Sequence, residues 1–293
     1  MSEQEYEKYY VPDQSPWPFV GAVALFLIAV GAGNFVVEVT KDKEGYGGVT
    51  LGVGVLILLV MLFGWFKNQI DESMSGLYSK QLDRSYRQGM SWFIFSEVMF
   101  FAAFFGALFY ARVFSVPWLG GASNNAMTAE VLWPSFEAIW PLVKTPGGTE
   151  TQAMGAAGLP LYNTIILLIS SVTCHFAHVG LEQNNRKKLT LFLGATILLG
   201  IVFLTLQVEE YIHAYTEMGL TLDAGVYGNT FFMLTGFHGM HVTLGTLMLI
   251  IMFLRVLSGH FTSKNHFAFQ ATSWYWHFVD VVWVCLFVFV YLI

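Results

Sequence analysis

The stretch GVTLGVGVLILLVMLFGWF (48–66) contains 19 residues and no charged side chain. A run of about 20 apolar residues is long enough to cross the hydrocarbon core of a bilayer as a helix. Because no water is available there to bond backbone N–H and C=O groups, the run predicts a helix and not an isolated strand. The stretch therefore indicates an integral membrane protein.

Six further apolar runs lie on either side of this stretch. The chain is 55% hydrophobic and 12% charged, about half the charged fraction typical of a soluble domain. The predicted fold class is all-α, a polytopic membrane protein with seven transmembrane helices in a single membrane domain over residues 1–293. A folded loop on the outer surface is expected at 111–158. The predicted spans are about 18–39, 48–66, 90–110, 159–181, 189–212, 228–254 and 274–293.

Lysine and arginine residues in the connections predict the orientation. With the N-terminus inside, ten of them lie in inner segments and four in outer segments. The positive-inside rule therefore places the N-terminus inside and the C-terminus outside. The formal net charge of −6 argues against nucleic acid as a partner.

Glu97 stands near the middle of the third predicted span. It lies ten residues beyond Arg87, which corresponds to about 15 Å along a helix. An ionisable side chain at this depth is a candidate functional group, and apolar surroundings favour its neutral form. Two interpretations remain open: a proton-linked or lipid-adjacent acid, and a neutral carboxyl that bonds a neighbouring helix.

Histidine pairs occur in two predicted spans. His238 and His241 share one face of the sixth span, and His175 and His178 repeat the spacing on the fourth. Two histidines on one helix cannot ligate both sides of a haem, whereas a pair from two helices could. Three glycines near the first pair favour close helix packing instead, with the imidazoles bridging helices or water. They are Gly236, Gly239 and Gly245.

The seventh span holds a third polar pair. His277 and Asp280 share a face, and a His/Asp pair can fix a tautomer for proton relay, or bond a neighbouring helix or subunit. Trp276 and Trp283, seven residues apart, predict a buried seam beside them. No catalytic residue and no metal site is predicted in this chain.

Basic and aromatic side chains mark the inner ends of three spans. Trp65 and Lys67 lie at the end of the second span. Arg87 lies at the start of the third span, and Arg255 lies at the end of the sixth. Such side chains anchor helices by reaching toward headgroups, and the arginine fork also fits a specific lipid phosphate. These four residues are the candidate lipid-binding residues.

Four segments together closely resemble subunit III of cytochrome c oxidase, and the resemblance runs from about the first span to the C-terminus. The seventh-span motif WHFVDVVW (276–283) is the most specific part. The segments are RQGMSWFIFSEVMFFAAFF (87–105), LQVEEY (206–211), DAGVYGNTFFMLTGFHGMHVTLGT (223–246) and FTSKNHFAFQATSWYWHFVDVVWVCLFVFVYL (261–292).

The resemblance implies a non-redox accessory subunit of a proton-pumping respiratory cytochrome c oxidase. Such a subunit packs on catalytic subunit I, sustains proton uptake and stability while oxygen is reduced to water, and holds phospholipids in a cleft between its first two helices and the other five. Subunit II and cytochrome c, the substrate of the complex, are the other implied partners. Haem and copper would belong to partner subunits. The implied location is a bacterial inner (plasma) membrane, with a cytoplasmic N-terminus and a periplasmic C-terminus.

By motif match, Glu97 resembles the buried third-helix carboxyl of the family, Arg87 its lipid-facing arginine, and Arg255 the basic residue that ends the sixth helix. The sequence departs from residues common in the family at four positions. They are Gly106, Tyr110, Val179 and Gln270.

Three other functions remain possible from the sequence. A quinol oxidase has a similar subunit, but this usually lacks the first two helices. A free-standing transporter would use Glu97 as its coupling acid and would be expected to have broken helices or a repeated half. A haem-bearing electron carrier would need the histidine pairs as ligands.

Overall fold

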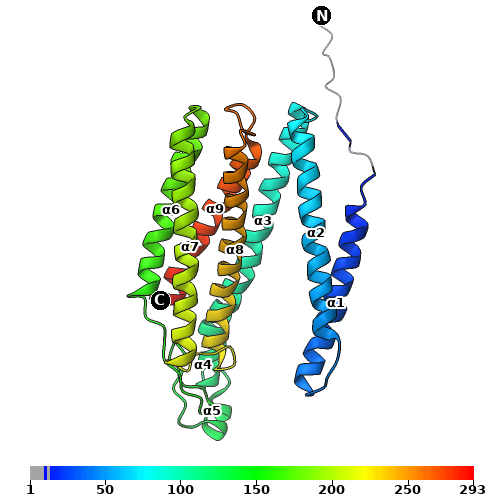
Figure 1. The fold of residues 1–293 in the computed structure, drawn as a ribbon. Helices are drawn as coiled ribbons and strands as arrows, with labels where there is room; N and C mark the ends of the chain where they lie inside the picture. The colour runs from blue at the N-terminus through cyan, green and yellow to red at the C-terminus, as the bar shows by residue number, and fades with distance from the viewer. Residues whose placement is uncertain (1–9, 12–13) are drawn as a thin grey trace, which may run out of the picture. The chain divides into compact units, whose positions relative to one another are not determined.

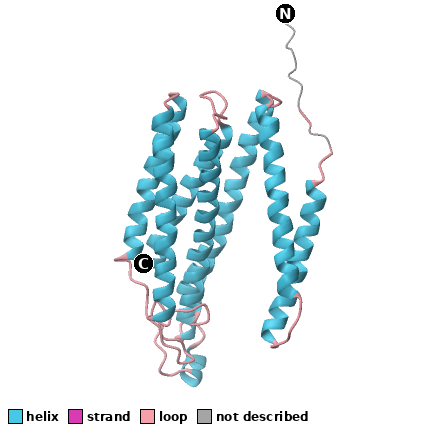
Figure 2. Cartoon of the chain, in the orientation of Figure 1, coloured by secondary structure: helices cyan, strands magenta, loops and turns pink. Residues whose placement is uncertain are grey.

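The computed structural model describes residues 10–11 and 14–293 and contains seven helices long and apolar enough to cross a membrane (Figure 1). The prediction of an all-α protein with seven spans is therefore confirmed, and the described residues form no named strand (Figure 2). Lys8, which entered the orientation argument, lies outside the described residues. The elements are α1 (Trp17–Thr40), α2 (Gly47–Met74), α3 (Lys80–Tyr110), η1 (Ala111–Ser115), α4 (Val116–Leu119), α5 (Ala126–Leu132), α6 (Leu159–Glu182), α7 (Arg186–Thr216), α8 (Val226–Leu257), α9 (Phe267–Leu286) and η2 (Phe287–Leu292).

Several helices run past the predicted boundaries. α2 continues to Met74 and α3 already begins at Lys80, because the polar Lys, Gln and Glu residues beyond the apolar runs are themselves good helix formers. The predicted outer loop also begins later than expected. α3 passes through η1, a π-helical turn, into α4 and ends at Leu119, so 111–119 is helical.

The chain forms two compact units, the first ending at Tyr86 and the second spanning Arg87–Ile293. In the first unit, α1 packs against α2. Glycines allow this contact: a methyl group at Gly31 would lie 2.7 Å from Leu51 Cα, in the α2 backbone. Small residues are the usual means of bringing two membrane helices close together. The Glu38 carboxylate accepts from the Gly47 N–H at 3.0 Å and so caps α2.

The second unit is a helix bundle. α6 packs on α7 and α9, and α8 packs on the same two helices. Trp276 and Trp283 of α9 are both fully buried in its core, which confirms the predicted seam. Gly245 makes room for Trp276, since a Cβ there would lie 2.9 Å from the indole. The expectation for Gly239 is wrong, because a Cβ at this position would meet nothing within 4 Å.

The segment between α4 and α6 is folded onto the end of this bundle. Lys144 and Glu150 form a salt bridge of 2.8 Å across an exposed turn. The Met154 N–H then donates to the Tyr227 hydroxyl at 3.0 Å, which holds the segment on the first turn of α8. Figure 1 shows α4 and α5 at the end of the bundle opposite to the α6–α7 and α8–α9 turns.

Candidate functional site

Glu97 and His241 meet inside the second unit. Glu97 Oε2 of α3 lies 2.9 Å from His241 Nε2 of α8, and the two side chains are 22% and 5% exposed. Aromatic rings enclose the imidazole: Phe101 meets it edge-on with ring centroids 4.9 Å apart, and Tyr275 stacks at 6.3 Å. The structure thus joins two residues that the sequence singled out separately.

The hydrogen bonds of His241 determine how many protons the pair holds. Nδ1 lies 2.7 Å from the Phe237 carbonyl oxygen. A carbonyl oxygen only accepts, so Nδ1 carries a hydrogen and donates it. One proton then remains between Nε2 and Glu97 Oε2, either on the carboxyl or on the imidazole. Burial of two charges is expensive, which favours a neutral imidazole that accepts from a protonated Glu97.

The neutral form of this pair predicts different effects for two substitutions. His241→Ala removes the acceptor of Glu97 and leaves a gap beside Phe101, so the free energy of unfolding should fall by about 2 kcal/mol. Glu97→Gln should cost less than about 1 kcal/mol, because the amide can still donate to Nε2. Unfolding of the detergent-solubilised protein, followed by far-UV circular dichroism, measures both changes.

Ser96→Ala is the matched control, since the Ser96 hydroxyl bonds the Phe93 carbonyl of its own helix and is exposed. Infrared spectroscopy should also detect a protonated carboxyl C=O band that disappears in Glu97→Gln. If Glu97→Gln proved as destabilising as His241→Ala, the pair would instead be ionised, because the amide would leave a buried imidazolium without its counter-charge.

His238 does not join this pair. Its ring is fully buried against Phe203 and Trp283, and Nε2 lies 3.2 Å from the Val279 carbonyl oxygen, to which it must donate. His178, one of the two α6 histidines that a cross-helix haem site could use, contacts other rings, those of His266 and Phe269. The histidines of α6 and α8 therefore serve separate clusters.

His277 bonds across helices, as one of its two interpretations predicted. Its Nδ1 lies 2.7 Å from the Ser171 hydroxyl of α6. The distance from Nδ1 to Asp280 Oδ2 is 3.8 Å, too long for a hydrogen bond. Asp280 is 5% exposed, and neither carboxyl oxygen has a hydrogen-bond partner among the described residues. The hydrogen-bond partner of His277 is therefore the Ser171 hydroxyl and not, as had been expected, the Asp280 carboxylate.

Sequence reasoning missed a third carboxyl, that of Glu210. Glu210 of α7 is 1% exposed, and its Oε1 accepts from the Tyr291 hydroxyl of η2 at 2.7 Å. The signal was available, because Glu210 lies inside the predicted span 189–212. The second unit therefore carries three buried or part-buried carboxyls at helix contacts, on α3, α7 and α9.

The two candidate arginines differ in exposure: Arg87 is part-buried, whereas Arg255 is buried. Arg87 donates from Nη1 to Gln270 Oε1 of α9, so a neutral amide stands where the family often has an acid. Its guanidinium also lies over the Phe267 ring, 5.0 Å from the centroid. Arg255 is only 8% exposed and packs on the Phe261 ring at 4.5 Å. Little of the Arg255 guanidinium is therefore accessible to the headgroup of a lipid.

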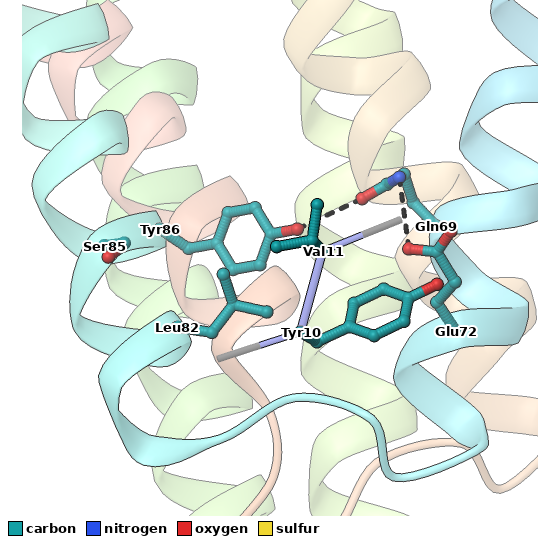
Figure 3. Close-up of a pocket in the computed structure, with 7 residues that line it drawn as sticks. All are labelled: Tyr10, Val11, Gln69, Glu72, Leu82, Ser85 and Tyr86. Carbon is teal, nitrogen blue, oxygen red and sulfur yellow. Dashed lines mark hydrogen bonds between the residues drawn. The ribbon is translucent and has the colours of Figure 1, made fainter. Parts of the chain in front are cut away.

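The first unit holds Trp65 and Lys67, both exposed on α2. It also encloses a cavity of about 360 Å³ near the end of α2 and the start of α3. Figure 3 shows the Tyr86 hydroxyl directed at Gln69, whose amide is directed at Glu72. The lining residues are Tyr10, Val11, Gln69, Glu72, Leu82, Ser85 and Tyr86.

Tyr78 fastens the α2–α3 connection to the same polar group. Its hydroxyl lies 3.2 Å from Glu72 Oε2 and 3.1 Å from Gln69 Oε1. Burial raises the pKa of Tyr78 above its ordinary value, and Tyr86 and Glu72 add to the shift. The hydroxyl therefore remains a donor, and its bonds to Gln69 and Glu72 hold the turn between α2 and α3.

Comparison with known proteins decides the family. The family model described as cytochrome c oxidase subunit III matches residues 7–293. The chain belongs to the cytochrome c oxidase subunit III family. It is therefore a multi-pass membrane subunit of an oxidoreductase complex and assembles with other oxidase subunits.

Curated relatives with the name cytochrome c oxidase subunit 3 match over nearly their whole length. The protein of Petromyzon marinus is 37% identical over 292 residues, which cover 99% of this chain and 98% of the relative. That of Felis catus is 39% identical over 285 residues, 97% and 96% of the two chains. That of Hippopotamus amphibius is 37% identical over 284 residues, with the same coverage. The match includes the first two spans, α1 and α2.

Proposed function

We propose that this chain is the non-redox accessory subunit of a proton-pumping respiratory cytochrome c oxidase. It packs on catalytic subunit I, binds phospholipid, and sustains proton uptake and stability while the complex reduces oxygen to water. Cytochrome c delivers electrons to the complex through subunit II, and haem and copper are held by partner subunits. The chain itself supplies no catalytic residue.

The observation that carries this proposal is the hydrogen bonding of the histidines at membrane depth. His241 donates to the Phe237 carbonyl and faces Glu97, and His238 donates to the Val279 carbonyl. Imidazoles held in this way brace one helix against another. Both ring nitrogens of His241 are engaged, Nδ1 with Phe237 and Nε2 with Glu97, so axial haem ligation by this ring would break one of the two bonds. This favours a structural role over electron transfer.

The lipid and orientation parts of the proposal rest on the distribution of charge and on packing. α1 packs with α2 in the first unit, and α6–α9 pack together in the second. Phospholipid in a cleft between the first two helices and the other five is what the family resemblance implies. Trp65, Lys67 and Arg87 are the proposed lipid contacts. The excess of Lys and Arg in one set of connections supports an N-terminus on the inner side of the membrane and a C-terminus on the outer side. We place these ends in the cytoplasm and the periplasm of a bacterial inner membrane.

Copurification tests the proposal directly. The tagged chain is purified from its own membrane in mild detergent, and copurifying polypeptides, haem, copper and phospholipid are measured before and after the complex is dissociated. We expect oxidase subunits I and II to copurify and to retain all haem and copper on dissociation, while phospholipid stays in part with this chain.

Other outcomes identify the alternatives. Haem that remained with the isolated chain would contradict the accessory role in favour of an electron carrier. A chain that came out alone and moved a solute in vesicles in a Glu97-dependent way would favour the transporter. Oxidation of quinol instead of cytochrome c by the purified complex would favour the quinol oxidase.

A further inference from the structure

A cluster that the proposed function does not use lies at the end of the second unit that carries the α6–α7 and α8–α9 turns. His178, Glu182 and His266 each direct one potential ligand atom into it, and these atoms lie within 4.8 Å of one another. Over residues 10–11 and 14–293, this is the one group of three or more His, Cys, Asp or Glu side chains that could hold a metal ion.

Two of the three ligands come from one face of α6. His178 and Glu182 are four residues apart, and His178 Nε2 lies 3.8 Å from Glu182 Oε1. This nitrogen is buried and has no hydrogen-bond partner among the described residues. A buried ring nitrogen without a partner is costly, and a metal ion would satisfy it. Glu182 is 57% exposed, so its carboxylate can move to complete the coordination.

The third ligand is oriented by a backbone carbonyl. His266 caps the start of α9, and its Nδ1 lies 3.1 Å from the Thr262 carbonyl oxygen. Since the carbonyl can only accept, Nδ1 carries the hydrogen and the lone pair of a neutral ring lies on Nε2. Histidines that bind metals almost always use the second nitrogen in this way, which fixes the tautomer and the direction of the ring.

The two turns that carry the ligands are bonded to each other. The Asn184 amide donates to the Ser263 hydroxyl at 3.3 Å, and the Arg186 guanidinium donates to the Phe261 carbonyl. The His178 and His266 rings are 5.6 Å apart between centroids. Four-coordinate zinc requires donor atoms about 3.3 Å apart, a distance that small side-chain rotations can reach from the observed arrangement.

We propose that His178, Glu182 and His266 form a binding site for a divalent transition-metal ion, with zinc as the best fit. Two imidazoles and one carboxylate are a known three-ligand zinc set that leaves the fourth position to water. Magnesium and calcium prefer oxygen ligands and are disfavoured by the two imidazoles. The ion links the C-terminal turn of α6 to the start of α9. The proposal does not depend on the roles proposed above for protons and lipids.

Equilibrium dialysis with zinc tests the site in the intact oxidase complex that contains this chain. The wild-type complex should bind one zinc ion more than the complexes carrying His178→Ala or His266→Ala, in which affinity at the site should fall about 100-fold or more. Glu182→Gln should weaken binding about 10-fold to 100-fold. Cobalt in place of zinc should give the visible absorption of a tetrahedral site in the wild type and lose it in the variants.

His213→Ala is the matched control, because His213 in the last turn of α7 and Glu217 just after the helix form the same i, i+4 pair, at 3.1 Å, without a third ligand. It should leave zinc stoichiometry and the cobalt spectrum unchanged. Equal yields of assembled complex and equal circular dichroism show that a variant is folded, and the exposed Glu182 is the substitution least able to disturb folding. Equal zinc binding in the wild type and Glu182→Gln, with no tetrahedral cobalt spectrum, would overturn the proposal.

Discussion

Trp276→Ala should lower the free energy of unfolding of the second unit by about 3–5 kcal/mol. Trp276 is fully buried, and Gly200 and Gly245 shape the space for its indole: a methyl group at either would lie within 3 Å of the ring. The surrounding helices can close only part of the cavity that the missing indole would leave. Its Nε1–H also donates to the Ser170 hydroxyl at 3.1 Å, so the substitution breaks a bond between α9 and α6.

Two further variants separate the causes of this loss. Trp276→Phe keeps an aromatic ring but loses the bond to Ser170 and should cost about 1–2 kcal/mol. Trp274→Ala, on the same helix, removes a side chain that is only part-buried, so we expect about 1 kcal/mol or less. The measurement is unfolding in detergent, followed by far-UV circular dichroism because tryptophan itself is changed. Equal losses for Trp274→Ala and Trp276→Ala would contradict the importance of the buried seam.

The seven spans could be predicted because the bilayer imposes a simple length and composition on each helix. Helix ends could not, since polar residues such as Lys80 or Gln270 extend a helix without extending its apolar run. The glycine pattern shows the same limit. Gly239 and Gly245 lie on the same helix, and the sequence gives no reason to distinguish them. Only Gly245 packs closely on another helix, where it contacts the Trp276 indole.

The buried polar residues could be predicted because an ionisable side chain inside a membrane costs free energy and so stands out in an apolar run. Their hydrogen-bond partners could not be predicted. Glu97 and His241 are 144 residues apart, and nothing in the local sequence of either specifies the other. His277 and Asp280 illustrate the opposite error: residues on one face of a helix need not bond each other when a hydroxyl from another helix, that of Ser171, is closer. His266 escaped notice because it lies in a turn, outside any predicted span.

The contact between α1 and α2 depends on Gly31, which stands directly against the α2 backbone. A side chain there would meet the amide nitrogen and Cα of Leu51. Backbone atoms cannot rotate away as a side chain can, so the two helices must separate. In membrane helices, van der Waals contact of this kind supplies much of the association energy. Gly33 lies two residues further along α1, and a Cβ there would meet nothing within 4 Å.

Gly31→Leu should therefore destabilise the α1–α2 pair by about 1–3 kcal/mol, while Gly33→Leu should change its stability by less than about 0.5 kcal/mol. Hydrogen exchange of the α1 and α2 backbone amides in the purified oxidase measures both.

If this pair forms one wall of the lipid cleft proposed above, the Gly31→Leu complex should also retain less phospholipid than the Gly33→Leu complex. Slower or equal exchange in Gly31→Leu would contradict the close packing. Faster exchange with unchanged phospholipid would keep the packing but remove α1 and α2 from the proposed lipid site.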